Sequence, residues 1–186
     1  MRASSVGAGR ARRGLTLLLT GALIAVAVAV VASLHLTFNL TTSMPLGFYR
    51  KLPVDRAPAR GDIVLLCPPA ALARFGAQRG ILPPGDCPEK TAPLLKHVAA
   101  VAGDVVDVRA SGIAVNGIAL PDSAPRATDS KGRPLRHVAP GRYVMRSGEL
   151  WLWSPSAVGW DSRYYGPLAA RDVKAFVLPF AVLPQR

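Results

Sequence analysis

The chain has 186 residues, half of them hydrophobic, and a formal net charge of +12 at pH 7. This length suits one ordinary domain with an appended segment and leaves no room for two large domains. Outside the first 14 residues, the basic residues are scattered among apolar ones, with no long Lys/Arg run. This pattern argues against a nucleic-acid-binding protein and favours a domain attracted to anionic lipid or to an acidic partner, or a merely solvated surface.

An apolar segment, residues 15–36, follows a short basic leader, residues 1–14. The apolar segment has no Asp, Glu, Lys or Arg over 22 residues, about 33 Å of helix, which is enough to cross a hydrocarbon core of about 30 Å. The leader has no acidic residue and carries Arg2, Arg10, Arg12 and Arg13. The positive-inside rule therefore predicts a transmembrane anchor with a cytoplasmic N-terminus. A cleavable signal peptide is the alternative, although its apolar region would be only about 7–15 residues long.

Residues 37–186 are then predicted to lie outside the membrane, with 19 Lys and Arg against 11 Asp and Glu. Both cysteines, Cys67 and Cys87, fall in this part. An even number of cysteines in an oxidising compartment predicts one disulfide, which would close a loop of about 20 residues and contribute about 3 kcal/mol. The spacing fits no metal motif, and no histidine is close enough to complete one. Residues 67–95 therefore read as a small stapled insertion.

The remainder of the outer domain consists of short apolar runs separated by Gly and Pro. Runs rich in β-branched and aromatic residues predict strands at 63–67, 95–101, 104–110, 112–116, 117–120, 141–147, 149–154 and 173–178. Asn116-Gly117 predicts a two-residue hairpin turn. One helix is predicted at 69–80, and the polar, turn-rich residues 121–135 are predicted to be a long exposed loop. We therefore expect a mostly-β barrel or sandwich.

None of the three histidines is suited to a Ser-His-Asp triad. His35 lies in or beside the predicted membrane segment, and His137 lies in a turn-rich segment. His97 directly follows Lys96 on a predicted strand, where neighbouring side chains point to opposite faces. A histidine base is therefore not expected.

Lys96 differs from the four other lysines of the outer domain, which adjoin polar or turn residues and are predicted to be solvated. Its surroundings, APLLKHVAAVAGDVV, are apolar. A lysine that faces apolar groups has a lowered pKa, and a neutral amine can accept the proton of a serine hydroxyl. Taken alone, Lys96 also fits an exposed strand position with its stem packed and its head in water.

Four segments occur in a fixed order behind the apolar segment. They are SMPLGFYR (43–50), RGDIVLL (60–66), LLKHVAAVAGDVV (94–106) and WDSRYYGPL (160–168). Together they resemble the signal peptidase I clan of Ser/Lys endopeptidases. Those enzymes carry a Ser-Met motif just after the anchor, a Gly-Asp strand, a Lys-containing strand that ends in Gly-Asp, and an Asp-Ser-Arg segment. The resemblance covers most of residues 10–180 and implies a signal-peptidase-like β-barrel or sandwich catalytic domain.

Finer features resemble one branch of that clan, the TraF-type conjugative-transfer peptidases. Pro45 directly follows Met44, the insertion carries a cysteine pair, and the last motif reads DSRYYGPL. The branch processes conjugative pilin precursors and in some systems joins the trimmed ends into a cyclic pilin. The resemblance implies a single-pass protein of the bacterial inner membrane with a periplasmic catalytic domain.

The resemblance assigns roles to five residues. Ser43 matches the nucleophile and Lys96 matches its general base. Thr41 matches a hydroxyl that, with the Ser43 N–H, holds the oxyanion. Asp161 and Arg163 match the Asp-Ser-Arg segment that supports the site.

One departure from the family pattern concerns Gly159. Many signal peptidases have a serine at this position, two residues before the Asp, and it helps to orient the lysine. Thr41, Ser154, Ser156 or a water molecule could supply that hydroxyl here, and the sequence leaves the choice open.

The predicted partners follow from these assignments. We expect a pilin precursor or another preprotein as substrate and inner-membrane lipid around the anchor, with no nucleic acid, no metal and no cofactor. Two alternatives remain. One is a general type I signal peptidase with the same chemistry, and the other is a non-catalytic, membrane-anchored β-domain that serves as an assembly partner.

Overall fold

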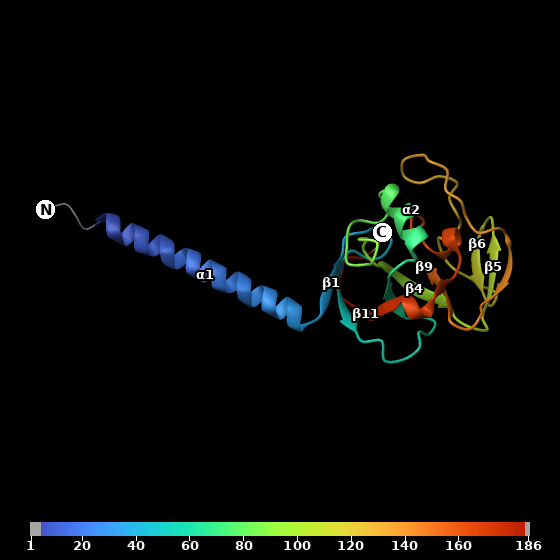
Figure 1. Cartoon of the computed structure of the whole chain (residues 1–186), viewed down its shortest axis with the longest axis horizontal. Coiled ribbons are helices and arrows are strands. Elements are labelled where there is room, and N and C mark those ends of the chain that lie inside the picture. The colour runs from blue at the N-terminus through green and yellow to red at the C-terminus, as the bar shows by residue number, and fades with distance from the viewer. Residues whose placement is uncertain (1–4, 185–186) are drawn as a thin grey trace. The chain divides into compact units, whose positions relative to one another are not determined.

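The structure is a computed structural model that describes residues 5–184. It divides into two compact units, with the division between Leu36 and Thr37. The first unit is dominated by one helix, α1 (Ser5–Ser33), drawn in blue in Figure 1. The first four residues of the predicted leader, including Arg2, lie outside the described residues. Among residues 5–184, no helix combines the length and the apolarity needed to cross a membrane.

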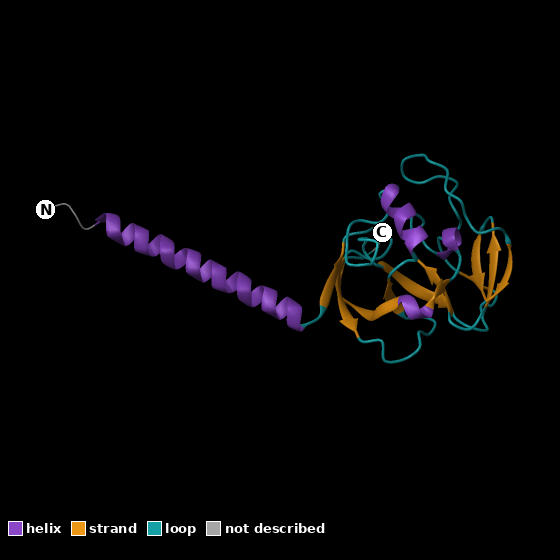
Figure 2. Cartoon of the chain, in the orientation of Figure 1, coloured by secondary structure: helices purple, strands orange, loops and turns teal. Residues whose placement is uncertain are grey.

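The second unit is mostly β, as the sequence predicts. Strands and loops make up most of it, and its helices are short (Figure 2). One sheet has seven strands in the order β1-β2-β11-β3-β4-β9-β10. These strands are β1 (Leu36–Asn39), β2 (Gly47–Leu52), β3 (Ile63–Leu66), β4 (Leu94–Ala100), β9 (Glu149–Trp153), β10 (Leu168–Ala169) and β11 (Val173–Val182). Sequence neighbours are often not sheet neighbours, so the sheet brings distant segments together.

A second sheet has four strands in the order β7-β6-β5-β8. Its strands are β5 (Val105–Arg109), β6 (Gly112–Val115), β7 (Ile118–Ala119) and β8 (Gly141–Val144). The predicted Asn116-Gly117 hairpin is present: both residues have positive φ, 50° and 82°, and Val115 pairs with Ile118 across the turn. Such a turn favours Asn and Gly because both tolerate the left-handed conformation.

Three apolar clusters hold the second unit together. One cluster packs against β3, β4, β9 and β11 and contains Val64, Leu66, Leu82, Leu94, Val98, Leu150, Leu152, Trp160, Leu168, Val173 and Phe176. A second cluster, around Trp151, joins β5 and β6 to the larger sheet. A third contains Met44 and Tyr49, both fully buried, beside Leu65 and Leu95. Burying one such side chain stabilises the fold by about 1.5–3 kcal/mol.

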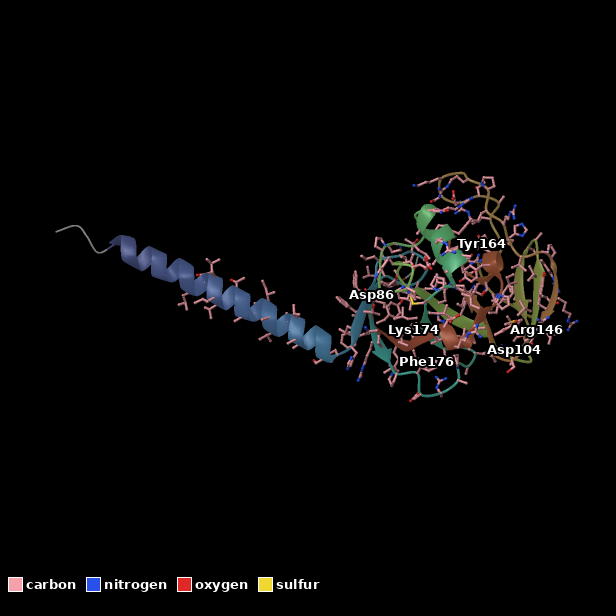
Figure 3. All side chains as sticks on the ribbon, viewed as in Figure 1. Asp86, Asp104, Arg146, Tyr164, Lys174 and Phe176 are labelled. Carbon is pink, nitrogen blue, oxygen red and sulfur yellow. A yellow bond between two sulfur atoms is a disulfide. The ribbon has the colours of Figure 1, made fainter. Side chains whose placement is uncertain are left out.

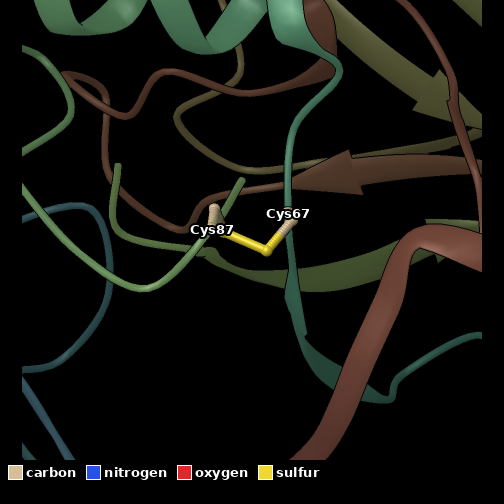
Figure 4. The surroundings of a disulfide bond; sticks show 2 residues. All are labelled: Cys67 and Cys87. Atoms are coloured by element: carbon tan, nitrogen blue, oxygen red, sulfur yellow. A yellow bond between two sulfur atoms is a disulfide. The ribbon is translucent and has the colours of Figure 1, made fainter. Parts of the chain in front are cut away.

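The insertion after β3 is stapled as predicted. Cys67 and Cys87 form a disulfide with their Cα atoms 5.6 Å apart (Figure 4). Helix α2 (Ala70–Gln78) lies within the loop that the disulfide closes, close to the range expected from the sequence. Farther on, an isolated bridge between Pro84 and Thr91 draws the two ends of the remaining loop together.

Several elements differ from the sequence prediction. Strands β1, β2 and β10, the short helix α3 (Ser162–Tyr165) and the 3-10 turn at Ala170–Asp172 were not expected. Strand β11 runs to Val182 instead of residue 178 because its first part pairs with β3 and its second part with β2. These differences arise from pairing between distant segments, which local residue patterns do not encode.

Candidate active site

The predicted nucleophile, Ser43, lies in the loop between β1 and β2. This loop is held from inside by the buried side chain of Asn39. The Asn39 amide nitrogen donates to the carbonyl oxygens of Thr41, Met44 and Pro45 at 2.9, 3.0 and 3.1 Å. An amide that bridges several carbonyls determines the path of the loop, since each of those oxygens would otherwise have to find another donor.

The structure brings Ser43 and Lys96 together from positions 53 residues apart. Lys96 Nζ lies 2.9 Å from Ser43 Oγ and donates to the Leu95 carbonyl oxygen at 3.0 Å. The first distance is within the range required for proton transfer between a nucleophile and a base. The two groups therefore lie within direct hydrogen-bond reach of each other.

Lys96 is buried, with 3% of its surface exposed. It pairs with Val64 across β3 and β4, and alternation along β4 puts it on the same face as Leu94 and Val98. Burial among these apolar groups lowers the pKa of Lys96 to about 8, while Asp161 raises it and Arg163 lowers it by smaller, opposing effects. A substantial fraction of the amine is therefore neutral near physiological pH.

The four other lysines of the outer domain are exposed: Lys51, Lys90, Lys131 and Lys174. Lys174, labelled in Figure 3, shows the contrast well, because it lies on an outward position of β11 whose neighbours Val173 and Ala175 are buried. The apolar surroundings read from the sequence thus distinguish Lys96 from the other lysines correctly.

Thr41 lies beside the nucleophile, with its Oγ1 3.1 Å from Ser43 Oγ. The same hydroxyl donates to Asn39 Oδ1 at 2.8 Å, and the Thr41 N–H donates to that oxygen at 3.1 Å. The Asn39 side-chain nitrogen faces three backbone carbonyls, so the side-chain oxygen points the other way and accepts the hydrogen bonds from Thr41. The Thr41 hydroxyl hydrogen is therefore engaged by Asn39 and would have to rotate to reach a substrate oxygen.

Asp161 and Arg163 form a buried ion pair behind the site, each with 1% exposure. Arg163 Nη2 and Nε donate to the two oxygens of the Asp161 carboxylate at 2.7 and 2.8 Å. Burial works against the charge of Arg163, but hydrogen bonding and the negative charge of Asp161 outweigh it and raise the pKa of the guanidinium. Arg163 also donates to the Asp122 carbonyl at 2.8 Å, which ties the turn-rich loop to this end of the sheet.

Gly159 has no hydroxyl, but the nearby Ser154 supplies one to the site. Ser154 is fully buried and its Oγ donates to the carbonyl oxygen of Ser43. It does not replace the expected contact with the lysine, because the acceptor that orients Lys96 is the Leu95 carbonyl. The sequence singled out Ser154 as one of several candidates, but it did not indicate that its partner would be the Ser43 backbone.

The role of Asn39 was not predicted from the sequence. An asparagine next to polar residues is common in proteins, so its type alone gives no indication of a role. Its position two residues before Thr41, in a segment directly next to the Ser-Met motif, is the feature that could have drawn attention to it. Asn39 contacts Thr41 and Ser154 contacts Ser43, so these two residues connect part of the predicted site to the rest of the domain.

Two of the histidines make contacts with other groups. His97 is half-buried, with its ring 5.6 Å from that of Trp153, and burial followed by the charge of Lys96 lowers its pKa. The His137 ring contacts the Val138 carbonyl. Within residues 5–184, no group of three His, Cys, Asp or Glu side chains could hold a metal ion.

A cavity of about 410 Å³ opens at Ser43 and Lys96. One wall is strand β1 with the loop that follows it, residues 37–43, and another comes from Leu94 and Leu95 of β4. The stapled insertion supplies a third wall through residues 81–84 and 92–93. The lining is mainly apolar, so the cavity favours apolar groups over charged ones.

Comparison of the sequence with known protein families identifies the class to which this fold and site belong. Residues 11–179 match the family described as signal peptidase, peptidase S26, and the chain belongs to that family. Within the family it is of the TraF type, because its curated relatives are TraF proteins of conjugal or plasmid transfer. The resemblance seen in the sequence is thereby confirmed.

Three relatives illustrate the match. A probable conjugal transfer protein TraF of Sinorhizobium fredii is 42% identical over 73% of this chain and 71% of its own length. A conjugal transfer protein TraF of Agrobacterium tumefaciens is 38% identical over 91% of this chain and 96% of its own length. A plasmid transfer protein TraF of Escherichia coli is 36% identical over 76% and 79%.

Among solved structures, the chain is similar to a signal peptidase I of Enterococcus faecalis. The two are 16% identical, with a TM-score of 0.36, and the match covers 65% of this chain and 97% of the other.

Proposed function

We propose that this protein is a membrane-anchored serine endopeptidase that cleaves a pilin precursor during conjugative transfer, with Ser43 as nucleophile and Lys96 as general base. The observation that carries the proposal is the 2.9 Å distance between Ser43 Oγ and the buried Lys96 amine, whose pKa is lowered to about 8. Membership of the signal peptidase family supports a peptidase, and the TraF relatives support a role in conjugation.

The first chemical step is acylation. The neutral Lys96 amine takes the proton from Ser43 Oγ as the oxygen attacks the scissile carbonyl carbon, and the C–N bond of the substrate breaks after a tetrahedral intermediate. The Lys96 ammonium then gives the proton to the departing amine. This leaves an ester between Ser43 and the acyl part of the substrate, with Lys96 neutral again.

The negative oxygen of the tetrahedral intermediate needs donors that face it. The Ser43 N–H and the Thr41 hydroxyl are the groups that we assign to this task. Since the Thr41 hydrogen bonds to Asn39 Oδ1 in the resting site, its rotation toward the intermediate would stabilise the transition state more than the ground state. That difference is what makes an oxyanion donor catalytic.

The substrate is expected to bind as an extended strand. Strand β1 lies at the edge of the seven-stranded sheet, and residues 37–39 line the cavity beside Ser43. A peptide added to this edge would obtain main-chain hydrogen bonds from β1 and place its small side chains in the apolar cavity. This mode selects small residues before the cleaved bond without requiring a deep pocket.

Residues 15–36 are proposed as the anchor, with the leader in the cytoplasm and residues 37–186 in the periplasm. The support comes from the 22 uncharged residues and the preceding arginines. Ser43 follows Leu36 by seven residues, so such an anchor would hold the nucleophile near the membrane surface, where precursors emerge. The family and the TraF relatives are compatible with a membrane-associated or periplasmic protein.

The ester can be resolved in two ways. Attack by water gives a trimmed linear product, whereas attack by an amine of the same substrate gives a cyclic one. Mass spectrometry of the mature pilin distinguishes them, because the cyclic product is lighter than the linear trimmed peptide by one water molecule.

The experiment that tests the proposal compares precursor processing by the wild type, Ser43→Ala and Lys96→Ala in membranes. Both variants should remain membrane-bound and lose processing. Normal maturation by Lys96→Ala would contradict the Ser/Lys mechanism, and retained transfer with Ser43→Ala would instead support a non-catalytic assembly partner. A broad secretion defect on depletion, rather than a defect in transfer, would favour a general signal peptidase.

A further inference from the structure

Ser154 and Gly159 face one another in the loop that connects β9 to α3. Both are buried, and Ser154 is fully so. A Cβ atom built on Gly159 would overlap the Ser154 side chain and lie 3.0 Å from the Ser156 carbonyl oxygen. The loop therefore has room for a side chain at only one of these two positions, and here position 154 has it.

Ser154 and Asn39 donate hydrogen bonds to different backbone carbonyls around the nucleophile. It donates to the Ser43 carbonyl oxygen, while the Asn39 amide donates to the carbonyls of Thr41, Met44 and Pro45. Asn39 thus holds the residues on both sides of Ser43 but not Ser43 itself. The carbonyl of the nucleophile depends on Ser154.

Ser154 is in turn held by the buried ion pair. Its N–H donates to Asp161 Oδ2 at 2.9 Å, and Arg163 Nη2 lies 3.4 Å from its carbonyl oxygen. Asp161 and Arg163 make no direct hydrogen bond to Ser43 or Lys96 among the interactions of the described residues. The hydrogen-bonded connection from this ion pair to the nucleophile therefore runs through the Ser154 backbone and hydroxyl, in addition to the effect of their charges on Lys96.

We propose that Ser154 is a positioning residue that orients Ser43 for attack, and that Gly159 is required because its missing side chain leaves the space that Ser154 occupies. The proposal rests on the proposed function, since it concerns the orientation of the nucleophile in that reaction. The supporting hydroxyl is thus supplied from the end of β9 instead of from position 159, and it acts on Ser43 instead of on Lys96.

Loss of the Ser154 hydroxyl should lower kcat with little change in KM. The Ser43 carbonyl would lose its side-chain donor, and a displacement of the nucleophile of about 1 Å reduces the rate by up to about 100-fold. Substrate binding along β1 and the surroundings of Lys96 would not change. The pH midpoint of the reaction should therefore stay at its wild-type value.

The test uses the full chain in detergent micelles with a precursor peptide. Ser154→Ala keeps most of the side-chain volume, so the variant should fold. A Tm well above the assay temperature will verify this. We expect its kcat to fall about 10- to 100-fold, with KM within twofold and an unchanged pH midpoint. A kcat within twofold of the wild type would overturn the proposal. A wild-type enzyme that cleaves no precursor would instead refute the proposed function.

A second measurement needs no activity. Gly159→Ala should lower the Tm by roughly 5 °C or more in the wild type, because the added methyl group meets Ser154. In a Ser154→Gly background the same change should cost much less, since only the Ser156 carbonyl oxygen then remains close to the added methyl group. An equal loss of Tm in both backgrounds would show that the two positions do not share one space and would overturn the proposal.

Discussion

Replacing Lys96 by methionine should make the protein more stable at neutral pH while abolishing its activity. Methionine keeps the length of the side chain and removes the buried charge. A lysine in the unfolded chain has a pKa of 10.5, whereas the pKa of Lys96 in the folded protein is about 8. Each pH unit corresponds to about 1.4 kcal/mol, so a protonated Lys96 costs about 3 kcal/mol at pH 7. The lost hydrogen bond to the Leu95 carbonyl offsets about 1 kcal/mol of the gain.

The sign of the pH dependence follows from the lowered pKa. Between pH 8 and 10.5 the unfolded chain binds a proton at Lys96 that the folded protein does not, so the stability of the wild type rises with pH in that window. The penalty is fully present below pH 8 and disappears above 10.5. The advantage of Lys96→Met should therefore be about 2 kcal/mol at pH 7, or roughly 4–8 °C in Tm. It should fall to zero and then reverse as the pH approaches 10.5, where only the lost hydrogen bond remains.

The assay is thermal unfolding of both full-length proteins in detergent, followed by circular dichroism at several pH values between 7 and 10.5. Lys174→Met is the matched control, because Lys174 is exposed on β11 (Figure 3). The control should track the wild type at every pH. A Tm difference between Lys96→Met and the wild type that stays constant with pH would refute the reasoning, since it would show that the Lys96 amine is not desolvated.

Three further predictions concern the same site. The kcat/KM of the wild type should rise with pH through a midpoint of about 8, since only neutral Lys96 acts as base; a midpoint below pH 6 in a pH-rate profile would argue for another group. Thr41→Val should lower kcat about 100- to 1,000-fold, with Thr41→Ser close to wild type in the same steady-state assay; equal rates would remove Thr41 from the oxyanion site. Ser substitution of both Cys67 and Cys87 should lower the Tm by roughly 6–12 °C, and an unchanged melting curve would show that the insertion needs no staple.

Much of the fold could be predicted from residue patterns. The β-branched and aromatic runs located most strands to within two residues, and Asn116-Gly117 located the hairpin. Strands β1 and β2 were not predicted, because strand formation there depends on pairing with distant segments. Strand β2, for example, pairs with the far end of β11, more than a hundred residues later. The contact that makes GFYRKL a strand is therefore not contained in its local sequence.

The candidate site divides in the same way. The burial of Lys96 follows from its apolar neighbours, and the structure agrees with that expectation. The roles assigned to Ser43, Thr41, Asp161 and Arg163 remain predictions, now with a geometry that can be tested. The support that Asn39 and Ser154 give to the nucleophile could not be predicted, because a buried amide or hydroxyl shows its function only through the carbonyls that it meets in the folded chain.

The role of Lys96 as base can be tested most directly by chemical rescue. Both native cysteines are paired in the disulfide, so Lys96→Cys introduces the one thiol that 2-bromoethylamine can convert to a lysine analogue after mild unfolding. We predict that Lys96→Cys is inactive, that alkylation restores precursor cleavage, and that the pH-rate midpoint of the restored enzyme is lower than that of the wild type, because the sulfur makes the amine more acidic. Cleavage by the unmodified variant, or a restored enzyme with the wild-type midpoint, would contradict proton transfer from Ser43 to Lys96.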